Sequence, residues 1–356
     1  MCGRVLRRHS IQCILPPYMV RAIAKNGSTK QRADALQTLS VDTTFRALRS
    51  SLLLLNPRPA RRVRALMGEP AKRRSIYTAN QTEDLPGDLV RTEGSAPSKD
   101  VAVDEAYDGL GATYDFYWDV YGRNSIDDEG LPLDATVHYG QDYDNAFWNG
   151  DRMVFGDGDG DLFNRFTVSV DVIGHELTHG VTEDEAKLTY LYQPGALNES
   201  VSDVFGSLIK QYGQKQTAKQ ADWLIGEGLF TKKVKGVALR SMKAPGTAYD
   251  DPVLGKDPQP AHMKNYVRTN GDNGGVHINS GIPNHAFYLV ATGLGGNAWE
   301  KAGHIWYETL RDPRLRPNTG FTRFARLTAS IAGRLYGVNS EEQKVVQNGW
   351  KQVGIG

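Results

Sequence analysis

Apolar residues recur at helical spacing between positions 168 and 183 of this chain. One face of a helix over that range carries Val168, Val172, Ile173, Leu177 and Val181. Because residues three and four apart share a face of an α-helix, this stripe predicts a helix that packs against a core.

A second apolar stripe follows the Pro194-Gly195 turn and predicts a helix from Leu197 to Ile209. Its buried face comprises Leu197, Val201, Val204, Phe205 and Leu208. Similar periodicity predicts helices over 41–55, 103–121, 297–310, 321–335 and 341–353, whereas 136–139 and 153–155 are typical of short strands between Gly and Asp turns. The patterns together predict strands before residue 165 and mainly helices after residue 185.

The first predicted helix carries His175 and His179 four residues apart, with Glu176 beside the first. Positions i and i+4 share one helix face, so both imidazoles can bind one metal ion. Glu176 then lies close enough to polarise a metal-bound water. A charged helix turn that fits the pattern by chance is the alternative, because five residues with three fixed are only moderately specific.

A catalytic zinc ion usually takes three protein ligands and keeps one position for water. Glu199, at the start of the second predicted helix, is the candidate for the third ligand. Asp203, one turn later on the same side, can orient a ligating histidine. Taken alone, these two residues are better explained as an acidic first turn that complements the helix dipole.

Several further motifs occur in a fixed order. They are Asn145-Ala-Phe-Trp-Asn-Gly150, Gly156-Asp-Gly-Asp-Gly160, His175-Glu-Leu-Thr-His179, Asn198-Glu-Ser-Val-Ser-Asp203, Leu239-Arg-Ser-Met242 and Asp272-Asn-Gly-Gly-Val-His-Ile-Asn-Ser-Gly281. With these motifs the chain resembles the thermolysin family of zinc metallopeptidases over roughly residues 85 to 356. The resemblance implies an α+β fold of two domains, one β-rich and one mainly helical, with the zinc helix at the floor of the cleft between them. We expect a propeptide and basic linker over 1–70, a β-rich domain over 71–184 and a helical domain over 185–356.

The resemblance also implies a role for each matching position. One catalytic Zn²⁺ would be bound by His175, His179 and Glu199. Glu176 would act as general base, and His277 and Tyr190 would stabilise the oxyanion. Asp272 would orient His277, and Asp203 would orient His175. The main chain of the peptide substrate would be held by Asn145, the backbone at Ala146, and Arg240.

By the same resemblance, six apolar residues would line the pocket for the residue just after the scissile bond: Phe163, Phe166, Val172, Ile225, Leu229 and Leu239. This pocket predicts endopeptidase cleavage on the amino side of bulky hydrophobic residues such as Leu, Phe or Ile. The alternative is that these six are ordinary core positions.

The chain departs from thermolysin at its calcium positions. Asp171, Asp222 and Glu227 match carboxylates of a paired calcium site, but Lys210 and Gly228 stand where two more would be. Because an ammonium group is no calcium ligand, we expect weak calcium dependence or none, with Lys210 neutralising the remaining acids. The Asp157, Asp159 and Asp161 run lacks the later Glu of a calcium loop and is typical of a tight turn.

The N-terminal segment contains both cysteines, Cys2 and Cys13, so no disulfide framework supports the rest of the chain. Cys13-Ile-Leu-Pro-Pro-Tyr-Met19 resembles the short propeptide of the protealysin-like branch of the family. Pro16 and Pro17 are stiff and lack backbone donors, so with Tyr18 they can lie extended in the cleft without being cut. The alternative is that Cys13 reaches the zinc as a thiolate. We expect maturation between about Ser50 and Ser75.

The amino-acid composition limits which classes of function remain open. The 356 residues carry 42 Lys and Arg against 41 Asp and Glu, a net charge of +1, so no global bias toward nucleic acid exists. The Arg-rich stretch 58–74 is interpreted as a solvated linker, with an anionic-surface site as the alternative.

No continuous apolar run typical of a secretory signal or a membrane span occurs, so we expect cytoplasmic accumulation, with secretion by a route without a cleaved signal as an alternative. The expected partners are protein and peptide substrates and the chain's own propeptide, and the expected state is a monomer. The rival function is a non-catalytic peptide-binding protein with the same fold.

Overall fold

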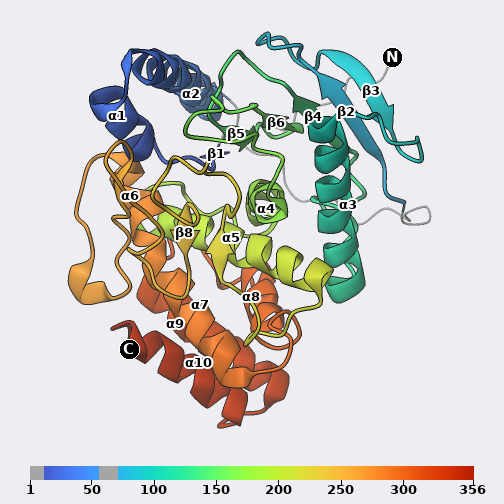
Figure 1. Cartoon of the computed structure of the whole chain (residues 1–356). Coiled ribbons are helices and arrows are strands. Elements are labelled where there is room, and N and C mark those ends of the chain that lie inside the picture. The colour runs from blue at the N-terminus through green and yellow to red at the C-terminus, as the bar shows by residue number, and fades with distance from the viewer. Residues whose placement is uncertain (1–11, 56–70) are drawn as a thin grey trace.

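The computed structural model describes residues 12–55 and 71–356, including backbone alone for residues 12 and 44–55. The six strands of the main sheet all lie before residue 156, and helices dominate after residue 170. Figure 1 shows α4 (Val170–Glu185) near the centre, with the sheet above it and α7 to α10 below it. This is the α+β arrangement that the sequence predicts.

Six strands form one mixed sheet in the order β1-β5-β6-β4-β2-β3. Their bounds are Gln12–Cys13 for β1, Arg74–Thr78 for β2, Asp88–Thr92 for β3, Leu133–Val137 for β4, Ala146–Trp148 for β5 and Arg152–Phe155 for β6. The pairs β2/β4 and β4/β6 are parallel, and the other neighbours are antiparallel. On the sheet side of the fold, α3 (Val101–Tyr121) packs against β2 and α4.

The edge of this sheet is completed by the N-terminal segment. β1 pairs antiparallel with β5, with Gln12 opposite Trp148 and Cys13 opposite Phe147. Extended peptides bind proteins in this way by adding a strand to an open sheet edge. The N-terminal segment is therefore bound to β5 by its backbone.

The packing of α4 against α5 (Tyr192–Gln214) positions the metal-binding motif. Two glycines let these helices approach closely. A Cβ on Gly206 would lie 2.4 Å from the carbonyl oxygen of Asp171, and a Cβ on Gly174 would lie 3.3 Å from the Cα of Gly206. Real Cβ atoms essentially never lie as close as 2.4 Å, and 3.3 Å is tighter than most Cβ contacts, so glycine at both positions lets α4 and α5 pack closely.

The start of α5 corrects the sequence prediction. α5 begins at Tyr192, so Pro194 and Gly195 lie in its first turn and Glu199 lies two turns inside the helix. Proline is tolerated there because the first N–H groups of a helix have no intrahelical partner. Gly195 then donates to the carbonyl of Leu191, which continues the helix.

The remaining helices are α6 (Asp272–Asn279), α7 (Gly281–Leu294), α8 (Ala302–Arg311), α9 (Phe321–Tyr336) and α10 (Glu341–Gln352). The predictions for α9 and α10 are confirmed within one residue. The prediction for α8 began five residues too early, because Asn297 to Lys301 form a turn in which Glu300 donates to the carbonyl of Asn297. The short strands β7 (Leu224–Ile225) and β8 (Arg240–Ser241) pair beside α5, and β9 (Asp250–Asp251) pairs with β10 (Gly255–Lys256).

The N-terminal segment continues as α1 (Pro17–Asn26) and α2 (Thr29–Leu55). The predicted helix over 41–55 is therefore the second half of a longer one. Most of the predicted basic linker lies outside the described residues. Its last part is ordered, since Lys72 pairs with Asp115 and Arg74 begins β2, so the solvated-linker interpretation is wrong there.

Candidate active site

Three side chains converge where α4 meets α5. The Nε2 atoms of His175 and His179 lie 3.0 Å apart, and each lies 3.5 Å from an oxygen of Glu199. A tetrahedral zinc ion with bonds of about 2.0–2.1 Å holds its ligand atoms about 3.3 Å apart. All three residues are buried, and the Glu199 Oε2 atom has no hydrogen-bond partner. The donor set therefore fits zinc.

A second layer of contacts fixes the two imidazoles. Asp203 lies 2.8 Å from Nδ1 of His175, while Asn198 and Ser202 lie 2.8 and 2.9 Å from Nδ1 of His179. Such partners set which ring nitrogen faces the metal. Sequence reasoning found Asp203 but missed Asn198 and Ser202, although both stand within one helical turn of Glu199 on α5.

The protonation states of His179 and Glu199 agree with metal binding. Burial would lower the pKa of His175, but Asp203 and Glu199 raise it to about 9, so this ring loses a proton when a metal binds. Burial lowers the pKa of His179 to about 3, so its ring is neutral. Burial alone would raise the pKa of Glu199, but His277, His179 and His175 together hold it well below its usual range. A neutral imidazole and a charged carboxylate are the forms that bind zinc.

Glu176 faces the same centre from α4. One of its oxygens accepts a hydrogen bond of 3.1 Å from the backbone N–H of Trp148, and the other is buried without a hydrogen-bond partner. Ligand atoms of Glu176, His175 and His179 all lie within 4.8 Å of one another. Burial raises the pKa of Glu176 well above its ordinary value, as suits a proton-accepting carboxylate.

His277 lies on α6, and its ring reaches Glu199 and Tyr190 at the same centre. Its Nδ1 lies 2.6 Å from Asp272, and its Nε2 lies 3.2 Å from the Tyr190 hydroxyl, which itself donates to Glu199. Burial opposes protonation of His277, but Asp272 and Glu199 raise its pKa. The Asn273–Gly275 backbone has positive φ throughout, and this tight turn brings Asp272 to Nδ1 of the ring.

Two family models match consecutive parts of the chain. The thermolysin metallopeptidase catalytic domain matches residues 65–183, and the thermolysin metallopeptidase alpha-helical domain matches residues 186–355.

The chain belongs to the thermolysin metallopeptidase family.

It is a thermolysin-like metalloendopeptidase of a zinc-dependent family. An extracellular metalloprotease of Pectobacterium carotovorum subsp. carotovorum is 54% identical over 350 residues, covering 98% of both chains. A thermolysin of Alicyclobacillus acidocaldarius is 41% identical over 288 residues, covering 78% of this chain and 50% of that one.

A solved structure, the precursor of protealysin from Serratia proteamaculans, superposes with a TM-score of 0.87. It is 56% identical and covers 97% of this chain and 100% of that chain. The resemblance to the thermolysin family and the predicted two-domain α+β fold are thereby confirmed, whereas the domain boundaries stay predictions.

The residues predicted to hold substrate main chain instead contact the N-terminal segment here. The backbone N–H of Ile14 donates to the carbonyl of Ala146 at 3.2 Å, and the N–H of Leu15 donates to Asn145 Oδ1 at 3.0 Å. Arg240 donates to the carbonyl of Ile14 at 3.2 Å and is otherwise paired with Asp203. Arg240 is buried, so its ion pair with Asp203 lies in the interior and not at the surface.

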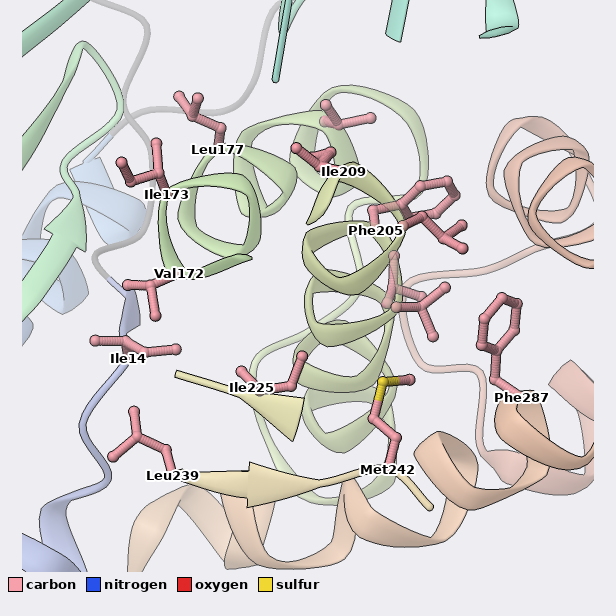
Figure 2. Packing of buried hydrophobic residues seen from close by; sticks show 14 of the residues in the cluster. Ile14, Val172, Ile173, Leu177, Phe205, Ile209, Ile225, Leu239, Met242 and Phe287 are labelled. Atoms are coloured by element: carbon pink, nitrogen blue, oxygen red, sulfur yellow. The ribbon is translucent and has the colours of Figure 1, made fainter. Parts of the chain in front are cut away.

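The six residues of the predicted pocket are each at most 1% exposed: Phe163, Phe166, Val172, Ile225, Leu229 and Leu239. They belong to the same core cluster as Ile14. Figure 2 shows the Ile14 side chain lying between Val172 and Leu239. Ile14 therefore packs among the residues that are predicted to line the pocket.

Two sequence predictions for this segment need correction. Pro17 and Tyr18 begin α1 rather than lying extended, because the fixed φ of proline suits the first helical position. The residues bonded to the substrate-holding groups are therefore Ile14 and Leu15, which sequence reasoning passed over. The Cys13 side chain packs in a separate cluster with Tyr143 and Phe147, which leaves its carbonyl, and not its thiol, at His277.

The acidic residues matched to a calcium site surround an ammonium group. Lys210 Nζ lies 3.0 Å from both Asp171 and Asp222, 3.8 Å from Glu227 and 3.2 Å from the carbonyl of Leu224. The predicted neutralisation by Lys210 is confirmed, while calcium dependence stays a prediction.

The Asp157 to Asp161 run forms a tight turn. Asp159 Oδ1 accepts from the backbone N–H groups of Asp161, Leu162 and Phe163, as an aspartate does when it caps a turn.

Proposed function

We propose that this chain is a neutral zinc endopeptidase that cuts on the amino side of bulky hydrophobic residues and is made as a zymogen. The observation that carries the substrate preference is Ile14 in the apolar pocket, with its backbone bonded to Ala146 and Arg240. A bulky aliphatic side chain therefore fits the pocket when the main chain is held in place.

The proposed chemistry follows from the geometry. His175, His179 and Glu199 would hold zinc, which would supply Lewis acidity and lower the pKa of a water molecule to about 7. Glu176 takes the proton of that water with its unpartnered oxygen and carries it to the departing amine. His277 and Tyr190 donate to the oxygen that becomes negative, and losing one such donor typically costs about 3 to 4 kcal/mol.

The N-terminal segment is proposed to act as an intramolecular inhibitor. It occupies the sheet edge, the predicted pocket, the acceptor oxygen of Asn145 and the donor group of Arg240 at once. A substrate that needs the same groups is excluded until the segment leaves. The precursor form of the protealysin structure supports a propeptide here.

A cleavage-site profile tests the substrate preference. The protein, freed of its first 70 residues or so by a second protease, is incubated with zinc and a random peptide mixture, and new N-termini are sequenced. We expect Leu, Phe and Ile to dominate the first position of the products. Charged residues at that position would contradict the pocket assignment.

Location, membrane contact and assembly are further proposals. The word extracellular in the name of the Pectobacterium relative supports export, which fractionation of a producing culture would test against cytoplasmic accumulation. Among the described residues, no helix is both long and apolar enough to span a membrane. We propose a monomer without a nucleic-acid partner, which sedimentation and filter binding would test.

A further inference from the structure

The N-terminal segment lies in the cleft like a substrate, residue by residue. The Cys13 carbonyl oxygen lies 3.2 Å from His277 Nε2, the proposed oxyanion donor. The next residue, Ile14, gives its N–H to Ala146 and its carbonyl to Arg240. Leu15 then donates to Asn145.

These contacts fix which bond lies at the reacting position. The carbonyl at His277 belongs to the residue before that bond, and the side chain in the apolar pocket belongs to the residue after it. Resting on the proposed function, we infer that the chain is its own substrate at the Cys13–Ile14 peptide bond.

The local sequence agrees with this assignment. Ile14 is a bulky aliphatic residue that is fully buried in the pocket, so the bond before it satisfies the proposed preference. Pro16 follows two positions after Ile14. Proline has no backbone N–H, but none of the hydrogen bonds described above needs a donor at that position. Neither a charged nor a proline residue flanks the bond directly.

The reaction is a hydrolysis and needs only water. The C–N bond between Cys13 and Ile14 breaks, the water oxygen forms a carboxylate on Cys13, and Ile14 becomes a free amine that takes a proton by way of Glu176. No oxidant or reductant is consumed. The product chain begins at Ile14.

This product stays in place because other contacts hold the segment. The new Ile14 amine keeps the Ala146 carbonyl as an acceptor. On α2, Asp42 accepts from Tyr143 at 2.8 Å and from Asn145 at 3.0 Å, and Gln31 donates to Asp161 at 2.6 Å. The cut chain is therefore held in the cleft, and the first cleavage alone leaves the site covered.

Intact mass and N-terminal sequencing of the full chain test this inference. The parent is incubated with zinc over a range of protein concentrations, and both the retained chain and released fragments are measured. We expect a species beginning at Ile14, formed at a rate independent of protein concentration. Ile14→Leu should keep the cut, Ile14→Asp should slow it at least about 100-fold, and Glu176→Ala should show none.

The outcomes separate this inference from the function on which it rests. If the freed enzyme cuts peptides before bulky residues but no product begins at Ile14, self-cleavage at this bond is wrong and the function stands. If the freed enzyme cuts no peptide at all, both the proposed function and self-cleavage at this bond are wrong. A rate that rises in proportion to protein concentration would also overturn cleavage within one molecule.

Discussion

At the scale of single residues, sequence predicts the ligand set well because helical spacing fixes geometry. His175 and His179 must share a face of α4, and the structure brings Glu199 to them across α5. The partners Asn284 and Asp42 could not be predicted. Asn284 donates to Asp203 from α7, 81 positions away, and nothing local marks such a contact.

Lys210 gives a residue-scale prediction about stability. Lys210 is 5% exposed, and its ammonium group forms ion pairs with both Asp171 and Asp222. Lys210→Ala leaves a buried carboxylate unpaired, so we expect a loss of about 3 kcal/mol in the free energy of unfolding. Urea unfolding measures it, with exposed Lys232→Ala as the matched control. An equal effect of both variants would contradict the role of Lys210.

The same site gives a prediction about calcium. With Lys210 in place, we expect the melting temperature of the parent to be the same in millimolar calcium and in a calcium chelator that spares zinc. Lys210→Asp removes the ammonium and adds a carboxylate, so its melting temperature should rise with calcium. A calcium-dependent parent would show that the ammonium does not replace the ion.

At the scale of elements, the periodic helices were predictable and the N-terminal segment was not. The stripes of α4, α9 and α10 repeat over several turns, whereas Gln12 and Cys13 owe their extended form to pairing with β5. A strand that exists only through a distant partner leaves no periodic signal. The sequence therefore did not identify Ile14 as the residue among the pocket side chains. The residues that it predicted to block the cleft begin at Pro16, two positions later.

Asp42 on α2 gives an element-scale prediction about latency. Its buried carboxylate accepts from Tyr143 and Asn145, and hydrogen bonds to a charged group contribute about 1.5–3 kcal/mol. Asp42→Asn should weaken the hold on the segment, so full-length protein should cut an added peptide at least about 10-fold faster. Asp34→Asn, the same change on the same helix, is the control. Equal rates for both variants would rule out an anchor at Asp42.

His138 gives an element-scale prediction about pH. It follows β4 and lies 2.9 Å from Asp157 and 3.0 Å from Asp100, the N-cap of α3. Hydrogen bonding to Asp157, followed by Asp100, outweighs burial and raises its pKa to about 9 from an ordinary value of 6.5. The folded pKa is the higher one, so its stabilisation is complete below about pH 6.5 and lost as the pH rises through 9.

The test of that linkage is a comparison of His138→Gln with the parent. We expect the variant to melt several degrees lower at pH 6 and the difference to shrink toward pH 10. A difference that stays constant from pH 6 to pH 10 would mean that the imidazole charge has no part in joining β4 to α3.

At the scale of the whole molecule, the order of motifs predicted the architecture because those motifs come from both halves of the cleft. Residues from β5, α4, α5, β8 and α6 meet at one centre, as Figure 1 allows the reader to follow. Periodicity alone could not have joined His277 to Tyr190, which stand 87 positions apart. The family resemblance supplied that link, and the structure places both side chains at Glu199.

The most direct test compares parent and Glu176→Gln after a second protease has removed the N-terminal segment. Zinc content and hydrolysis of one peptide with a central Leu are measured on the same samples. We predict equal zinc content and a rate about 10²–10⁴-fold lower for the variant, because the ligands remain and only the proton acceptor is lost. Comparable rates for the two proteins, or a zinc-loaded parent that leaves the peptide intact, would contradict the catalytic account of this site.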